Sequence, residues 1–205
     1  MVNNDAIRFL DFYIQQTSGN FAEDETAFAT NVEISCFLRD EFRKGDITRN
    51  RLFQWVFIAF YGMKMVPERG KMAFFERMEE FRNNHSDLNA REVTEGLASL
   101  MGKNYFSFAT KMLNLLDDTT YPIYDSQVAT VFQRPFAPEE SRLDHQCLIY
   151  QDIIDTYRQL KDHPAIELFR THFNCPQLGY MKILDSIFWR LGRIMEDNAE
   201  EFPWQ

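Results

Sequence analysis

The sequence has few of the residues that stabilise small secreted domains or bind structural metals. Its 205 residues include three cysteines, Cys36, Cys147 and Cys175, which lie far apart and form no CxxC pair. Neither a disulfide framework nor a cysteine-rich zinc or iron–sulfur site is therefore indicated. The four histidines also lack the paired spacing within one helix that metal-binding motifs use. We expect no metal, no other cofactor and a reducing compartment.

Long apolar runs are absent as well. No segment reaches the roughly 18 to 20 uninterrupted apolar residues that a membrane span requires. The first ten residues, MVNNDAIRFL, contain Asp5 and lack the basic run and apolar stretch of a signal peptide. These absences predict a cytoplasmic protein without a membrane partner.

The chain has fewer basic than acidic residues. The formal net charge is -9, from 22 Lys plus Arg and 31 Asp plus Glu. A protein that binds duplex DNA through its phosphates ordinarily has the opposite balance, so the net charge counts against a nucleic-acid role. Residues 38–82 differ, with ten basic and seven acidic side chains. This local surplus could attract a polyanion or form an ordinary solvated face.

Apolar and aromatic residues are abundant. Hydrophobic residues make up 45% of the chain, which includes 20 Phe, so we expect one folded domain spanning residues 1–205. Apolar residues recur at intervals of three and four without sustained alternation, which predicts an all-α fold with no sheet. The expected helices cover residues 4–16, 23–44, 48–63, 71–83, 90–101, 106–116, 126–132, 139–161, 164–173 and 180–196. The tail, residues 200–205, is expected to fray.

The most informative stretch is residues 102–132, GKNYFSFATKMLNLLDDTTYPIYDSQVATVF. Lys111 lies in a short helix that the run Asp117 to Thr120 terminates. Tyr121 must be extended because the ring of Pro122 disfavours a helical conformation before it. Asp125 then stands at the N-cap of the next helix. A helix, a turn and an extended return can bring Lys111 and Asp125 together.

A buried amine beside a carboxylate is a workable pair for attack on an electrophilic carbon. Burial lowers the pKa of an amine and makes it available as a nucleophile, while the carboxylate orients it or stabilises a developing cation. The alternative is structural: Asp125 only caps its helix, and Lys111 extends to solvent or forms an ion pair with it. The residues alone leave both interpretations open.

The order of residues in this stretch resembles the helix-hairpin-helix DNA glycosylases. In the bifunctional members a helix carrying lysine follows the hairpin, and a proline-containing extended step then leads to an aspartate that caps the next helix. Here ATK ends at Lys111, and YPIYDSQV contains Asp125. The stretch is similar to the 8-oxoguanine DNA glycosylase-like branch and its small bacterial members of unassigned function. More loosely, LDSIFWRLGR resembles their closing helix.

The resemblance implies a compact multi-helix fold with 102–132 as the active-site segment. It also implies excision of a damaged purine, such as 8-oxoguanine, from double-stranded DNA. Lys111 corresponds to the Schiff-base nucleophile and Asp125 to the aspartate that supports it. In the family, glycines in the hairpin let the protein's backbone amides approach a DNA phosphate. Those glycines are replaced here, so contacts with the DNA backbone are expected at Lys103 and Asn104 instead. The other hypothesis is a non-enzymatic helical module, derived from that fold, for nucleic-acid or protein interaction.

Aromatic side chains near this segment, and one on the last expected helix, are candidates to hold a base extruded from the duplex. Trp189 lies at the flank of the apolar stripe of that helix, where an indole can be half buried and contact a ligand. The candidates for the aromatic wall are Phe106, Phe108, Tyr121, Tyr124 and Trp189, although most aromatic residues in so Phe-rich a chain must belong to the core.

Overall fold

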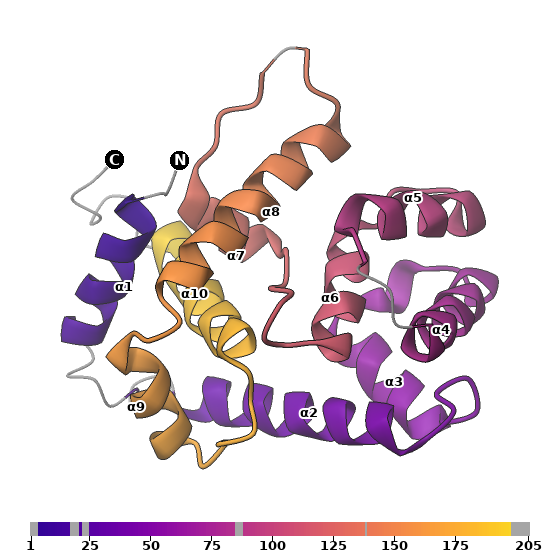
Figure 1. Ribbon diagram of the computed structural model, residues 1–205, viewed down its shortest axis with the longest axis horizontal. Helices are drawn as coiled ribbons and strands as arrows, with labels where there is room; N and C mark the ends of the chain where they lie inside the picture. The colour runs from indigo at the N-terminus through magenta and orange to yellow at the C-terminus, as the bar shows by residue number, and fades with distance from the viewer. Residues whose placement is uncertain (1–3, 17–20, 22–24, 85–87, 138, 198–205) are drawn as a thin grey trace.

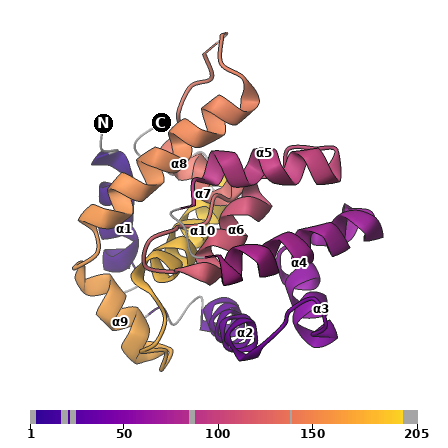
Figure 2. The same cartoon turned by 45° about the vertical axis from the view of Figure 1, so that its right-hand side comes forward.

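The fold consists of helices that pack at oblique angles around two apolar clusters (Figures 1 and 2). The computed structural model describes residues 4–16, 21, 25–84, 88–137 and 139–197, and no strand occurs within these ranges. The helices are α1 (Asn4–Gln16), α2 (Glu25–Lys44), α3 (Arg51–Phe60), α4 (Glu68–Asn83), α5 (Ala90–Met101), α6 (Phe106–Leu116), α7 (Ser126–Phe132), α8 (Arg142–Gln159), α9 (Pro164–His172) and α10 (Tyr180–Asp197), with a short 3-10 helix, η2 (Met63–Met65), after α3.

The expected all-α class is confirmed, and all ten expected helices are present. In the part of the chain that the structure describes, no helix is long and apolar enough to cross a membrane. The tail 200–205 lies outside the described residues.

The two clusters divide the helices into two groups that share α2 and, through Tyr150, α8. One cluster joins α1, the first half of α2 and α7 to α10, with Val32 and Phe188 among its members. The other joins the second half of α2 to α3, α4, α5 and α6, with Leu38 and Phe57 among its members. Figure 1 shows α2 running beneath both groups. The two clusters bury the apolar stripes that no single helix pair could cover.

Local signals in the sequence set the helix ends in and around residues 102–132, the segment that contains Lys111 and Asp125. Gly102 ends α5 in the left-handed conformation, with φ +71°, which a residue with a side chain rarely adopts. Asp125 begins α7, and its side chain accepts the backbone N–H of Gln127 at 3.2 Å. Ser141 and Asp144 form a reciprocal capping box at the start of α8. The helix before the turn and the helix after it therefore have fixed ends.

Helices α7 and α10 cross closely at Gly192. A Cβ atom at Gly192 would lie 1.9 Å from the carbonyl oxygen of Gln127, so only glycine permits this approach. The crossing holds the start of α7, and with it Asp125, against α10.

Candidate functional site

The extended segment after α6 returns along that helix. Asp117 ends α6, and its carboxylate accepts the backbone N–H of Thr119 at 2.8 Å, which tightens the turn. The Asn114 side chain then donates to the carbonyl oxygen of Tyr121 at 2.7 Å. The hydroxyl of Thr110 accepts the N–H of Tyr124 at 3.0 Å. These two bonds fix the returning chain beside α6.

The return brings Lys111 and Asp125 together, as the sequence predicted. Lys111 Nζ lies 3.3 Å from Asp125 Oδ2, and the two side chains are 8% and 25% exposed. Two rings lie near the amine, with its nitrogen 5.3 Å from the Tyr61 centroid and 5.5 Å from the Phe108 centroid. Burial lowers the pKa of Lys111, although the charge of Asp125 opposes that effect. The amine therefore loses its proton more readily than an exposed lysine.

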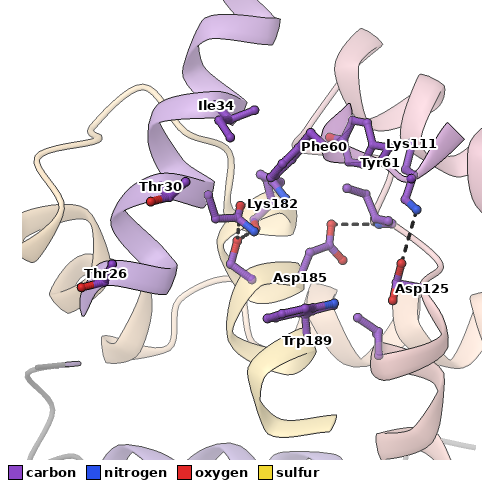
Figure 3. Close-up of a pocket in the computed structure, with 15 residues that line it drawn as sticks. Thr26, Thr30, Ile34, Phe60, Tyr61, Lys111, Asp125, Lys182, Asp185 and Trp189 are labelled. Atoms are coloured by element: carbon purple, nitrogen blue, oxygen red, sulfur yellow. Dashed lines mark hydrogen bonds and ion pairs between the residues drawn. The ribbon is translucent and has the colours of Figure 1, made fainter. Parts of the chain in front are cut away.

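Lys111 and Asp125 line a cavity of about 630 Å³ where the two groups of helices meet (Figure 3). Its walls come from α2, the end of α3 with the turn at Gly62, α6, residues 123–128 and α10. A cavity of this size falls within the range that holds small organic ligands. The lining is largely apolar and aromatic, with charged groups at a few places.

Two further charged residues, Lys182 and Asp185, line the same cavity. Asp185 Oδ2 accepts the N–H of Ile123 at 2.8 Å, and burial raises the pKa of Asp185 well above its ordinary value. Burial lowers the pKa of Lys182, whose ammonium has no hydrogen bond or ion pair among the described residues. The cavity thus contains two amines and two carboxyl groups.

Sequence reasoning missed Lys182 and Asp185 because it placed the last helix in the core by its apolar stripe. The available signal was their spacing: Lys182, Asp185 and Trp189 follow at i, i+3 and i+7 and so share one helix face. Two charged residues on one face of a helix, beside its apolar stripe, indicate a polar site on that face. Only the packing shows that this face is buried.

Of the five aromatic candidates, Trp189 lines the cavity and is 36% exposed. Phe106 is a core residue that packs edge-on against Tyr124, with the ring centroids 5.2 Å apart. Phe108 stacks on Tyr105 behind Lys111. Tyr121 lies beside a separate pocket, where its hydroxyl accepts the N–H of Leu88 at 3.3 Å. Instead, Phe60 and Tyr61 supply aromatic surface opposite Trp189 in Figure 3.

The candidate phosphate contacts lie in the connection between α5 and α6. Lys103 and Asn104 are both exposed there. The side chain of Asn104 accepts the N–H of Phe106 at 3.2 Å and so helps to begin α6. Lys103 is therefore the freer of the two side chains to contact a backbone phosphate.

Most of the basic side chains of residues 38–82 are paired. Six of the ten form ion pairs with acidic residues, five of them three residues away on the same segment: Arg39, Lys44, Arg49, Lys71, Arg77 and Arg82. The other four, Arg43, Arg51, Lys64 and Arg69, have no ion pair among the described residues. The local surplus of positive charge is thus carried by few free side chains.

The comparisons with known proteins give no independent assignment. No protein-family model, no curated protein and no solved structure matches the chain. The candidate site therefore depends on its own geometry: a buried amine held by a carboxylate at the wall of a cavity of about 630 Å³.

Proposed function

We propose that this protein is a DNA glycosylase that excises a damaged purine, such as 8-oxoguanine, with Lys111 as the nucleophile. The observation that carries the proposal is the 3.3 Å contact between Lys111 Nζ and Asp125 Oδ2 at the wall of a cavity of about 630 Å³. The order of Lys111, the extended YPIYD step and the capping Asp125 supports it through the resemblance to helix-hairpin-helix glycosylases.

In the proposed reaction, the target nucleotide leaves the duplex and its base enters the cavity. Lys111 passes a proton to Asp125, and its nitrogen attacks the sugar C1′. The bond between C1′ and the base nitrogen breaks, and its electron pair leaves with the base, which takes up a proton. Asp125 returns the proton to the departing base, and the restored carboxylate stabilises the positive charge on the imine that forms on Lys111 when the sugar ring opens. Loss of a proton from C2′ then expels the 3′ phosphate.

The walls of the cavity suit a flat heterocycle. Trp189 faces the cavity from α10, while Phe60 and Tyr61 face it from the end of α3 (Figure 3). Aromatic faces hold an extruded base by stacking, which contributes about 1–3 kcal/mol per base. A base between these side chains would place its sugar toward Lys111 and Asp125.

Borohydride trapping tests the proposal. The imine is reduced to a stable amine, so the protein should become covalently linked to duplex oligonucleotides that contain 8-oxoguanine or an abasic site. Lys111→Gln should abolish the adduct, while Lys161→Gln should leave it unchanged because Lys161 is an exposed lysine after α8. The absence of an adduct across a panel of lesions would refute the proposal.

A non-enzymatic interaction module is the second candidate, and the charge distribution favours it. The net charge is -9, and most basic side chains of 38–82 are engaged in ion pairs. In this case Lys111 and Asp125 form a structural pair. Fluorescence anisotropy with duplex DNA separates the glycosylase from a protein-binding module, because only the glycosylase requires salt-dependent DNA binding. Lys111-dependent borohydride trapping separates it from a non-enzymatic module that binds nucleic acid.

A further inference from the structure

Helix α10 presents three side chains to the cavity from one face. Lys182, Asp185 and Trp189 all line it, and Figure 3 shows them following one another along α10. Trp189 is 36% exposed, whereas Asp185 and Lys182 are only 3% and 5% exposed. The indole therefore lies at the rim, and the two ionisable groups form the floor.

The amine of Lys182 is buried without a polar partner. Its nitrogen forms no hydrogen bond and no ion pair with any residue that the structure describes, yet packing does not close it off from solvent. Its near neighbour is an apolar ring, since the centroid of Phe60 lies 5.9 Å from Nζ (Figure 3). A buried ammonium without a partner is destabilised, whereas a neutral amine needs no counter-ion. The end of Lys182 is therefore open to a ligand in the cavity.

Asp185 does not serve as that partner. Its Oδ2 accepts the N–H of Ile123 at 2.8 Å, and its Oδ1 is closed off from the cavity and interacts with the side chain of Tyr157. Burial raises the pKa of Asp185 well above its ordinary value, which favours the neutral acid over a counter-ion. The floor thus offers a ligand one reactive group, the amine of Lys182.

The surroundings of Lys182 favour its neutral form. Burial lowers the pKa of Lys182, and the positive charge of Lys111 lowers it too. Three carboxyl groups oppose this shift: Asp185 on α10, Asp125 at the start of α7 and Asp118 in the turn after α6. However, Asp125 is the ion-pair partner of Lys111, at 3.3 Å, and no carboxylate is paired with Lys182. Of the two amines, Lys182 is the one without a group that holds its proton.

From this arrangement we infer that Lys182 forms an imine with a small aromatic aldehyde that enters the cavity past Trp189. The amine nitrogen bonds to the carbonyl carbon, and the π electron pair of the carbonyl moves to its oxygen. The nitrogen lone pair then forms the C=N bond as the oxygen leaves, and both amine protons depart with that oxygen as one molecule of water. This activity goes beyond the proposed glycosylase and does not depend on it.

The lack of a basic partner separates this chemistry from attack at a sugar carbon. In the proposed glycosylase reaction, Lys111 passes a proton to Asp125, which lies 3.3 Å away. A carbonyl oxygen instead takes up the protons of the amine itself. Lys182 therefore needs no carboxylate to react with an aldehyde.

The walls of the cavity set the kind of aldehyde. Phe60 and Tyr61 face the cavity from the end of α3, and Trp189 faces it from α10, so a flat ring can stack between them (Figure 3). The volume of about 630 Å³ admits a ligand of this size. An aliphatic aldehyde would gain no stacking.

Benzaldehyde and acetaldehyde are the matched probes. Each is added with cyanoborohydride to the natural protein at neutral pH without DNA, and the labelled lysines are identified by peptide mass spectrometry. We expect benzaldehyde to label Lys182 about tenfold faster than the exposed Lys161, with a rate that saturates as its concentration rises. Acetaldehyde should show a smaller preference. Trp189→Leu should raise the benzaldehyde concentration for half-saturation by about two- to tenfold and leave labelling by acetaldehyde unchanged.

Labelling of Lys182 by benzaldehyde that is no faster than that of Lys161, or that rises linearly with concentration, would overturn the inference. An equal preference for Lys182 with acetaldehyde would overturn it too, because the ring would then not be recognised. Lys111→Arg keeps the positive charge but removes the nucleophile of the glycosylase, so it should lose trapping on abasic DNA and retain benzaldehyde labelling of Lys182. Absence of Lys111-dependent trapping would remove the glycosylase, while saturable labelling of Lys182 would still support this inference.

Discussion

Asp125 divides its two carboxylate oxygens between Lys111 and the start of α7. Oδ2 lies 3.3 Å from Lys111 Nζ, and Oδ1 accepts the N–H of Gln127 at 3.2 Å. The residue that pairs with the buried amine is therefore also the residue that begins the next helix. Its charge can therefore be removed while its capping oxygen is kept.

The first prediction separates those two roles. Asp125→Asn keeps a side-chain oxygen for the Gln127 N–H but removes the charge, whereas Asp125→Ala removes both. We expect Ala to lower the free energy of unfolding by about 1 kcal/mol and Asn to lower it less, as measured by urea denaturation. Both variants should lose trapping at an abasic site. Full trapping by Asp125→Asn would show that the carboxylate charge is not needed.

The second prediction concerns pH. Burial lowers the pKa of Lys111 below its ordinary value of 10.5, and the charge of Asp125 raises it in part. The neutral amine therefore becomes populated, and trapping should increase with pH, with a midpoint below 10.5. Asp125→Asn removes the opposing charge, so the pKa of Lys111 should fall further.

The titration is best followed by NMR of the lysine Nζ resonances, with Lys111→Gln used to assign the signal. This readout does not depend on catalysis, so it remains informative if Asp125→Asn is inactive. A Lys111 pKa that stays unchanged or rises in Asp125→Asn would contradict the prediction.

Periodicity and capping signals in the sequence were sufficient to place the helices, with α5, α6 and α7 found at their expected bounds. The beginning of α4 was misplaced: the helix was expected from residue 71, but it begins at Glu68, so that Gly70 lies in its first turn. A Cβ at Gly70 would lie 3.0 Å from Val66 Cγ1, so this glycine provides room for packing. Sequence alone does not distinguish that role from a turn.

The site was predictable only where the chain itself brings its residues together. Lys111 and Asp125 are 14 residues apart and joined by one turn, so local rules suffice to pair them. Lys182 reaches the same cavity only because α10 is covered on its apolar face and also meets α2 and α3 at the cavity. Burial of the α10 face that carries Lys182 depends on tertiary packing, which the local sequence does not indicate.

The third prediction tests how α10 positions Asp125. Gly192→Ala should destabilise the protein by about 3 kcal/mol and reduce trapping, because the new Cβ would lie 1.9 Å from the Gln127 carbonyl oxygen and displace the start of α7. Gly96→Ala is the control. Its Cβ would have only Arg77 Nη2 near it, at 3.9 Å, so it should stabilise α5 by about 0.5–1 kcal/mol. Equal effects of the two substitutions on thermal unfolding would argue against the close crossing.

The last prediction is that the floor of the cavity reduces stability. Lys182 and Asp185 are both buried, yet they form no hydrogen bond with each other. Replacing such a pair with residues of similar volume is often stabilising by about 1–4 kcal/mol, because the desolvation of two charges is avoided. Lys182→Met with Asp185→Asn should therefore raise the free energy of unfolding by about 1–3 kcal/mol.

The asparagine in this double variant retains an acceptor for the Ile123 N–H, so that hydrogen bond is kept while both charged groups are removed. Lys161→Met with Asp162→Asn is the matched control, since that pair is exposed and its atoms are 3.9 Å apart. It should leave stability unchanged. A less stable Lys182/Asp185 double variant would mean that the two groups stabilise each other, and would contradict the prediction.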